Sequence, residues 1–114
     1  IKMSKQIGVL AEDLAYNYLI GLGLRCIRRN FYSRFGEIDL IMQDGDTSVF
    51  VEVRKRSSGN AFANESITLA KQRKLVKTAQ YYLMKLGKDV NCRFDAVLID
   101  ANDNIEWLKN IIIL

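Results

Sequence analysis

The first part of the chain repeats apolar side chains at three- and four-residue steps, the spacing of an amphipathic helix. The repeat runs from Lys5 to Leu22. Ser4 is placed to cap this helix at its start, and Gly21 and Gly23 mark its end. The apolar face is expected to carry Ile7, Leu10, Ala11, Leu14, Ala15, Tyr18, Leu19 and Leu22.

Shorter runs rich in β-branched and aromatic residues then predict three strands, over residues 24–31, 37–42 and 47–55. The first strand mixes aliphatic and basic residues, which favours a position at the edge of a sheet. Asp44-Gly45-Asp46 is a strong signal for a tight turn between the second and third strands. The polar segment from Arg56 to Asn64 is expected to be a loop.

A second helical repeat spans Ser66 to Leu86, and Gly87 closes it. Strands are expected at Phe94–Ile99, inside the sheet, and at Ile105–Lys109, followed by an apolar tail, Ile111–Leu114. The inner stripe of the second helix is expected to be Ile67, Ala70, Leu75, Ala79, Tyr82, Leu83 and Leu86. The order helix, three strands, helix, two strands predicts an α/β domain with a mixed sheet of about five strands flanked by helices.

Composition supports one globular domain over residues 1–114, since 49% of the residues are hydrophobic and 26% are charged. Met3 looks like a natural start, so Ile1 and Lys2 are expected to be a remnant ahead of it. The sequence has neither a signal-peptide pattern nor an apolar run long enough to span a bilayer. We therefore expect a cytoplasmic protein without membrane contact, in which Cys26 and Cys92 are reduced.

Charge and histidine content narrow the chemistry. Lys and Arg number 17 against 13 Asp and Glu, a net charge of +4 that suits a polyanionic partner without requiring one. The chain contains no histidine. This excludes histidine general bases, catalytic triads and histidine–zinc sites. Acid–base or metal chemistry must therefore come from Asp, Glu, Lys, Tyr or Cys.

The hairpin formed by the second and third strands gathers charge on one face. Because strand side chains alternate, Glu37 and Asp39 share a face, as do Glu52 and Arg54. A two-residue turn at Gly45-Asp46 places Asp39 opposite Glu52 and Glu37 opposite Arg54. A turn one residue earlier places Glu37 opposite Glu52 instead. The other face is expected to carry Ile38, Leu40, Met42, Val49, Val51 and Val53.

Two carboxylates opposite one another repel, and unpaired charge inside a sheet is costly. A cation between Asp39 and Glu52 would remove this cost, and ligands that are all oxygen favour Mg²⁺ or Mn²⁺. Such a metal could polarise a phosphate oxygen and activate water for phosphodiester hydrolysis. Arg54 could bind the phosphate in a bidentate manner, but its guanidinium could not act as a general base.

A structural alternative is a solvent-exposed hairpin face whose acids pair with Arg54 and Arg56. The alternation pattern alone supports this alternative and the metal site equally. The basic residue two positions after Glu52 and the basic helix that follows favour the functional interpretation.

Gly36-Glu37-Ile38-Asp39-Leu40-Ile41 and Val49-Phe50-Val51-Glu52-Val53-Arg54 resemble the core of the PD-(D/E)xK nuclease superfamily. The closer resemblance is to the YraN-like family of small bacterial proteins, which are similar to archaeal Holliday junction resolvases. The resemblance extends from about Gly8 to Trp107. Further landmarks are Gly8-Val9-Leu10-Ala11-Glu12 with Ala15, Arg29-Asn30-Phe31, Lys71-Gln72 and Cys92-Arg93-Phe94-Asp95.

The resemblance implies a restriction-endonuclease-like fold, a nucleic-acid substrate and a Mg²⁺ or Mn²⁺ cofactor. Asp39 takes the place of the metal-binding aspartate, and Glu52 that of the acid in the (D/E)xK motif. Glu12 falls where resolvase-like members carry a helix-borne acid near the metal; otherwise it is a solvated helix residue. Val53 completes the expected metal-binding set.

Arg54 departs from the superfamily pattern, whose last position is usually lysine. The departure implies a slow nuclease, a nuclease that needs a partner, or a protein that binds without cutting. Lys71, on the following helix, is a candidate replacement, although a solvated lysine or a phosphate contact is favoured there. Glu37 could orient Arg54 or a water molecule. The expected catalytic set is Asp39, Glu52, Arg54, Glu37 and Lys71.

Basic residues on both sides of the hairpin are expected to form a phosphate-binding rim. Tyr32 and Phe35 could stack on bases or simply pack against the fold. The expected nucleic-acid-binding residues are Arg28, Arg29, Arg34, Arg56, Lys74 and Lys77.

Three functions remain open. The first is an endonuclease acting on nucleic acid, with DNA favoured and branched or single-stranded forms preferred. The second is a nucleic-acid-binding module without catalysis. The third is a protein that binds a partner through its apolar tail and retains a vestigial nuclease site. The sequence leaves room for a homodimer in each case.

Overall fold

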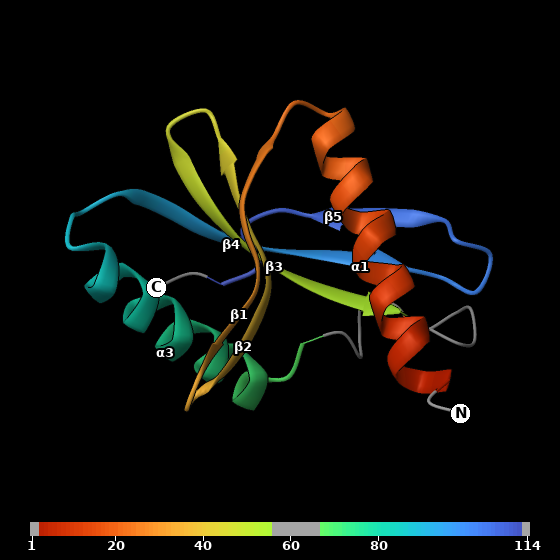
Figure 1. Cartoon of the computed structure of the whole chain (residues 1–114), viewed down its shortest axis with the longest axis horizontal. Coiled ribbons are helices and arrows are strands. Elements are labelled where there is room, and N and C mark those ends of the chain that lie inside the picture. Colours follow the sequence, from red (N-terminus) through yellow and green to blue (C-terminus); the bar gives the residue numbers. More distant parts are fainter. Residues whose placement is uncertain (1–2, 56–66, 113–114) are drawn as a thin grey trace.

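A five-stranded mixed sheet lies between two helices in the computed structural model, which describes residues 3–55 and 67–112 (Figure 1). The strands lie in the order β1-β2-β3-β4-β5, and only β3 and β4 are parallel neighbours within these residues. This confirms the predicted mixed α/β architecture, with the first strand at an edge. The elements are α1 (Met3–Gly21), β1 (Arg25–Ser33), β2 (Gly36–Asp44), β3 (Thr47–Lys55), α3 (Leu69–Leu86), β4 (Asn91–Ile99) and β5 (Ile105–Leu108).

The register of the β2–β3 hairpin follows from its turn. The paired positions run from Asp44–Thr47 to Leu40–Val51, so the turn is Gly45-Asp46. Gly45 has a φ of +60°, which glycine adopts without steric cost. The turn and register are therefore the first of the two alternatives, but the ladder ends at Leu40–Val51, and neither Asp39–Glu52 nor Glu37–Arg54 is among its paired positions.

Two hydrophobic clusters lie on opposite faces of the sheet, one beneath each helix. The α1 cluster joins Ala11, Ala15 and Leu19 to the sheet, and the α3 cluster does the same with Leu75 and Ala79. On the sheet, the α1 cluster includes Leu40, Met42, Val49, Val51, Val97 and Ile99, and the α3 cluster includes Phe31, Ile38, Ile41, Phe50 and Phe94.

The placement of Ile38 corrects the expected alternation on β2. Ile38 packs with Ile41 beneath α3, whereas Leu40 packs beneath α1. The interruption lies at Asp39, beside a residue of β1 with unusual geometry: Asn30 has a φ of +53°. A left-handed residue inside a strand distorts the local pleat, so side chains two apart no longer point to the same face.

Helix boundaries differ from the expected ones. The first helix begins at Met3, so Ser4 lies inside it rather than before it. The second begins at Leu69 instead of Ser66, because Thr68 has extended geometry and its side chain accepts a hydrogen bond from the N–H of Lys71. Strand bounds differ from the predictions by at most three residues. Among the members of the predicted helix faces whose burial the structure describes, those that are exposed are Leu10, Tyr18, Leu22, Ala70 and Leu86.

The chain beyond β5 folds back onto the sheet. The N–H of Ile111 donates to the carbonyl oxygen of Phe94, and Ile112 is buried in the α3 cluster. This described half of the apolar tail therefore packs within the domain's own core. The predicted loop from Arg56 to Asn64 lies outside the described residues. No helix in the described part of the chain is long and apolar enough to cross a membrane.

Candidate metal centre

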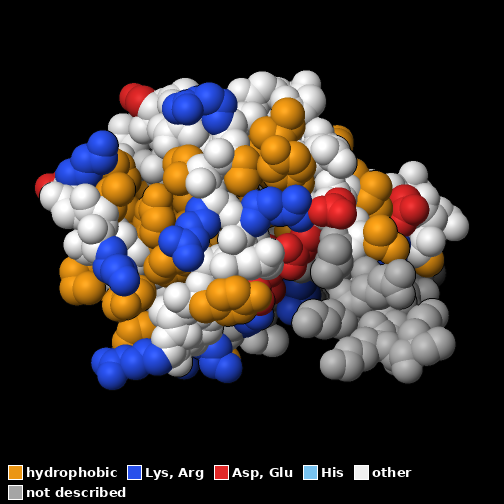
Figure 2. Space-filling model, in the orientation of Figure 1, with side chains coloured by type: hydrophobic (Ala, Val, Ile, Leu, Met, Phe, Trp, Pro, Cys, Tyr) orange, Lys and Arg blue, Asp and Glu red, His pale blue; other side chains and the backbone are white. Residues whose placement is uncertain are grey.

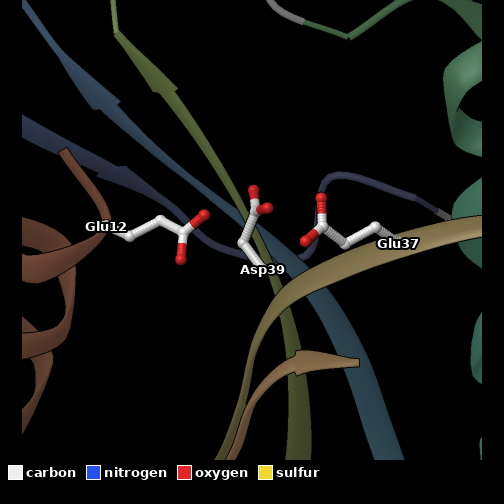
Figure 3. Close-up of side chains that lie close together, drawn as sticks. All are labelled: Glu12, Glu37 and Asp39. Atoms are coloured by element: carbon white, nitrogen blue, oxygen red, sulfur yellow. The ribbon is translucent and has the colours of Figure 1, made fainter. Parts of the chain in front are cut away.

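Three carboxylates converge where α1 approaches the start of β2. Glu12 comes from α1, and Glu37 and Asp39 come from β2; one oxygen of each lies within 4.8 Å of the others (Figure 3). Glu12 follows Ala11, which is buried against the sheet, so the helix holds Glu12 close to β2. Glu37 and Asp39 lie two residues apart on β2, at the place where the strand's alternation is interrupted, and both carboxylates reach the Glu12 carboxylate. The fold thus concentrates three negative charges in a small volume.

Asp39 is the most buried member of the three, with only 9% of its surface exposed. Its Oδ2 accepts a hydrogen bond of 2.8 Å from the backbone N–H of Val53. Burial raises the pKa of Asp39 to about 8, and the charges of Glu52, Glu12 and Glu37 add to this rise. The carboxylate therefore needs a proton or a cation for its charge to be compensated. Val53, an expected metal ligand, contributes its N–H to Asp39 in this structure.

Asn30 connects the acids across β1 and α1. Its Nδ2 donates to Glu12 Oε1 at 2.9 Å and to Glu37 Oε2 at 3.2 Å. Burial raises the pKa of Glu12, the hydrogen bond from Asn30 lowers it, and the charge of Glu37 raises it further. Sequence reasoning noted Asn30 only within a landmark and missed it as a site residue. The available signal was an asparagine in the middle of a strand, a residue that strands disfavour and that tolerates left-handed geometry.

Glu52 lies beside this cluster but is paired with cations. It is 4% exposed, and its Oε2 lies 3.2 Å from Lys71 Nζ and 3.6 Å from an Arg54 guanidinium nitrogen. Lys71 reaches it from the first turn of α3, where Thr68 Oγ1 accepts the Lys71 backbone N–H. Among the described residues the three-acid group contains Glu12, Glu37 and Asp39, and Glu52 is not a member. The structure therefore brings the expected catalytic residues together in two adjoining sets.

The basic residues expected to form one rim occupy different environments. Arg29 is bound to Asp13 of α1 at 2.6 Å and stacks over Tyr16. Arg28 lies over the ring of Phe31. Arg34 and Lys77 both lie over the ring of Phe35, at the end of the β1–β2 hairpin, and Lys74 adjoins Gly36 in the same region. Arg56 lies outside the described residues.

The face of the molecule drawn in Figure 2 combines both signs of charge. Figure 2 shows acidic side chains near the middle of this face, with Lys and Arg side chains beside them and more over the region of α3. An acidic centre with a basic surround is the charge pattern expected of a site that holds a cation and attracts a polyanion.

Comparison with known proteins assigns the chain to a family. A model described as "Uncharacterised protein family UPF0102" matches residues 11–99. The chain belongs to this family. It is 52% identical over 106 residues to a UPF0102 protein of Nitrosospira multiformis, covering 90% of this chain and 89% of the relative. A UPF0102 protein of Psychromonas ingrahamii is 49% identical over 114 residues, with coverage of 96% and 92%.

The UPF0102 model matches the part of the chain that contains the three-acid group and Glu52 with its two cations. These residues run from Glu12 on α1 to Lys71 on α3. The donors present also fit a hard divalent cation. Glu12, Glu37 and Asp39 offer only carboxylate oxygens, which Mg²⁺ and Mn²⁺ prefer over softer ligands. Glu12, Glu37 and Asp39 are therefore the residues of this UPF0102 chain that could hold a metal.

Proposed function

We propose that this protein is a metal-dependent nuclease that hydrolyses phosphodiester bonds in nucleic acid, using Mg²⁺ or Mn²⁺. The observation that carries the proposal is the convergence of Glu12, Glu37 and Asp39 next to the Lys71–Glu52 ion pair. A metal held by acids can activate water for this reaction, and a lysine beside it can stabilise the charge that develops.

The architecture supports the proposal. A mixed sheet flanked by helices is compatible with a restriction-endonuclease-like fold, and we assign the chain to that fold as part of the proposal. The acids sit on the first helix and the second strand, as in the PD-(D/E)xK resemblance. The net charge of +4 suits a polyanionic substrate.

The proposed roles follow from position and protonation chemistry. A divalent cation held by Glu12, Glu37 and Asp39 would supply Lewis-acid polarisation of a phosphate oxygen and a more acidic bound water. Lys71 Nζ, fixed by Glu52, would hold and orient the attacking water or exchange a proton with it. Arg54 would stabilise negative charge on the phosphate through its guanidinium, which is not a proton carrier in proteins. In this proposal Lys71 would take the role that arginine at the last motif position cannot.

The test is a cleavage assay on end-labelled single strands, duplexes, flaps and four-way junctions in Mg²⁺, Mn²⁺ or EDTA. Cleavage is expected only with metal. Asp39→Asn and Lys71→Met should each reduce the rate by at least a hundredfold, because each removes an interaction with the reacting groups. The matched controls are Asp89→Asn and Lys88→Met, which make the same chemical changes at exposed positions after α3. Equal cleavage by wild type and Asp39→Asn, or none in any metal, would refute the proposal.

A nucleic-acid-binding module without turnover is the second candidate, and Arg54 at the last position of the motif favours it. This candidate predicts binding at low salt that Asp39→Asn leaves unchanged. It also predicts no cleavage in either metal. A Lys71→Arg variant separates the two candidates further, since it keeps the charge while removing proton exchange.

A further inference from the structure

Two surface hollows meet at Tyr81, where α3 runs beside the β1–β2 hairpin. The larger, of about 740 Å³, is lined by Arg34, Phe35 and Lys77 together with Tyr81. The smaller, of about 310 Å³, lies on the other side of Tyr81 and is lined by Arg28, Tyr32 and Lys85. We call these seven residues the Tyr81 track.

Cations and aromatic rings alternate along the track. Arg34 lies 4.9 Å from the centre of the Phe35 ring, and Lys85 Nζ lies 5.3 Å from the centre of the Tyr81 ring. The Tyr32 side chain has 66% of its surface exposed, and its hydroxyl lies beside Glu37, whose carboxylate raises the pKa of Tyr32. Figure 2 shows the same mixture of basic and hydrophobic side chains over the region of α3. Rings that bind bases and cations that bind phosphates are both present on one continuous surface.

The track is also uniformly positive. Its four cations are Arg28, Arg34, Lys77 and Lys85, and no acidic residue is among the described residues that line the two hollows. Within the described chain none of the four forms an ion pair, whereas Arg29, Lys71 and Arg93 each pair with a carboxylate. A polyanion can bind cations that have no carboxylate partner without first breaking an ion pair.

The track begins next to the candidate metal centre. Phe35 lies in the turn between β1 and β2, two residues before Glu37. Tyr32 is the direct partner of Glu37 in the β1–β2 ladder. Lys77 lies on the same helix as Lys71, which contacts Glu52. A strand lying along the track would therefore end close to the three carboxylates.

We propose that the Tyr81 track binds single-stranded nucleic acid and leads an unpaired strand to the metal centre. Bases of an unpaired strand stack on Tyr81, Phe35 and Tyr32 while Arg34 and Lys77 contact its phosphates. A duplex keeps its bases stacked internally, so it gains the phosphate contacts and loses the ring contacts. The proposal rests on the proposed function for the class of ligand, but binding to the track requires neither metal nor cleavage.

The test measures the anisotropy of a fluorescein-labelled thymidine oligonucleotide and of a hairpin duplex of equal charge, both in EDTA. The single strand is expected to bind at least tenfold more tightly than the duplex. Tyr81→Ala should weaken single-strand binding about tenfold and Tyr81→Phe should restore it, because the ring makes the contact. Tyr32→Ala should also weaken single-strand binding. Because Tyr32 is exposed, this variant should fold, so it still tests the proposal if Tyr81→Ala does not fold.

Lys77→Ala should lower the slope of log affinity against log salt by about one, the value for one phosphate contact. The matched control is Lys109→Ala, which removes a lysine stacked 4.3 Å over Trp107, just after β5 at the opposite edge of the sheet. It should leave binding unchanged.

Equal affinity for single strand and duplex, or normal binding by Tyr32→Ala and Tyr81→Ala, would overturn the proposal. So would an acidic peptide that competes as well as the oligonucleotide, since the surface would then attract any polyanion. Ring-dependent single-strand binding without cleavage in any metal would refute the nuclease and leave the track established. Metal-dependent cleavage with no effect of Tyr32→Ala or Tyr81→Ala on binding would support the nuclease and refute the Tyr81 track.

Discussion

Replacing Asp39 with asparagine should make the metal-free protein more stable, and increasingly so as the pH rises. Asp39 is almost fully buried and its pKa lies near 8 in the folded chain, against 3.8 ordinarily. Between pH 3.8 and about pH 8, Asp39 therefore holds a proton in the folded state that it has lost in the unfolded chain. Stability from this proton is complete below about pH 4 and is lost as the pH rises towards 8. Asparagine keeps an acceptor for the N–H of Val53 and carries no charge to compensate.

The size of the effect follows from proton linkage. One proton bound only in the folded state changes the folding equilibrium by up to tenfold per pH unit. Between pH 5 and pH 7 the advantage of Asp39→Asn over wild type should thus grow by up to about a hundredfold, roughly 3 kcal/mol. The difference should level off above about pH 8. At pH 5 the two proteins should differ little in comparison.

The assay is urea unfolding in EDTA at several pH values, followed by far-ultraviolet circular dichroism and by fluorescence of the single tryptophan, Trp107. Taking the difference between variant and wild type cancels titrations that both proteins share. Asp89→Asn, an exposed control with the same change of charge, should not alter the pH dependence. Adding Mn²⁺ at pH 8 should stabilise wild type more than Asp39→Asn, since a cation would replace the missing proton. A flat difference from pH 5 to pH 8, or a variant less stable at pH 8, would refute the reasoning.

Three structural predictions follow from other contacts. Asp95→Asn should destabilise the fold by about 3–5 kcal/mol in urea unfolding, because Asp95 is fully buried and accepts hydrogen bonds from Arg93 and Trp107; a change below about 1 kcal/mol would contradict this. Gly36→Ala should lower stability by about 1–3 kcal/mol through its φ of +151°, with no steric clash to relieve; an unchanged thermal midpoint would contradict that origin. Thr68→Ala should cost about 1 kcal/mol and Thr68→Ser much less, and equal losses in both variants would exclude the helix cap as the cause.

Local signals in the sequence were sufficient for the hairpin. A glycine in a short turn between two alternating runs leaves few registers, and β3 was predicted with its observed bounds, Thr47–Lys55. The edge position of the first strand followed from its basic residues in the same way. These features depend on neighbours in sequence, which is where pattern reasoning is strongest.

The arrangement of the site depended on contacts between distant segments. Ile38 packs beneath α3 next to the left-handed Asn30, and alternation alone gives no sign of this placement. The pairing of Lys71 with Glu52 depends on where α3 begins, and Thr68 delays that start beyond the predicted Ser66. The sequence pattern and the family resemblance therefore placed the acids in one region, but could not divide them into the three-acid group and the ion-paired Glu52.

The segment after β5 has a consequence for the synthesis of this protein. Asp95 receives hydrogen bonds from Trp107 and from the backbone N–H of Asn110, and Ile112 fills part of the core beneath α3. A nascent chain that has emerged only as far as β4 would expose this buried carboxylate and leave that core incomplete. The acids and the lysine of the candidate site all lie before residue 72, yet the layer that holds α3 in place closes only with the last described residues. Folding on the ribosome should therefore be completed only after residues 107–112 have emerged, well after the charged residues of the candidate site.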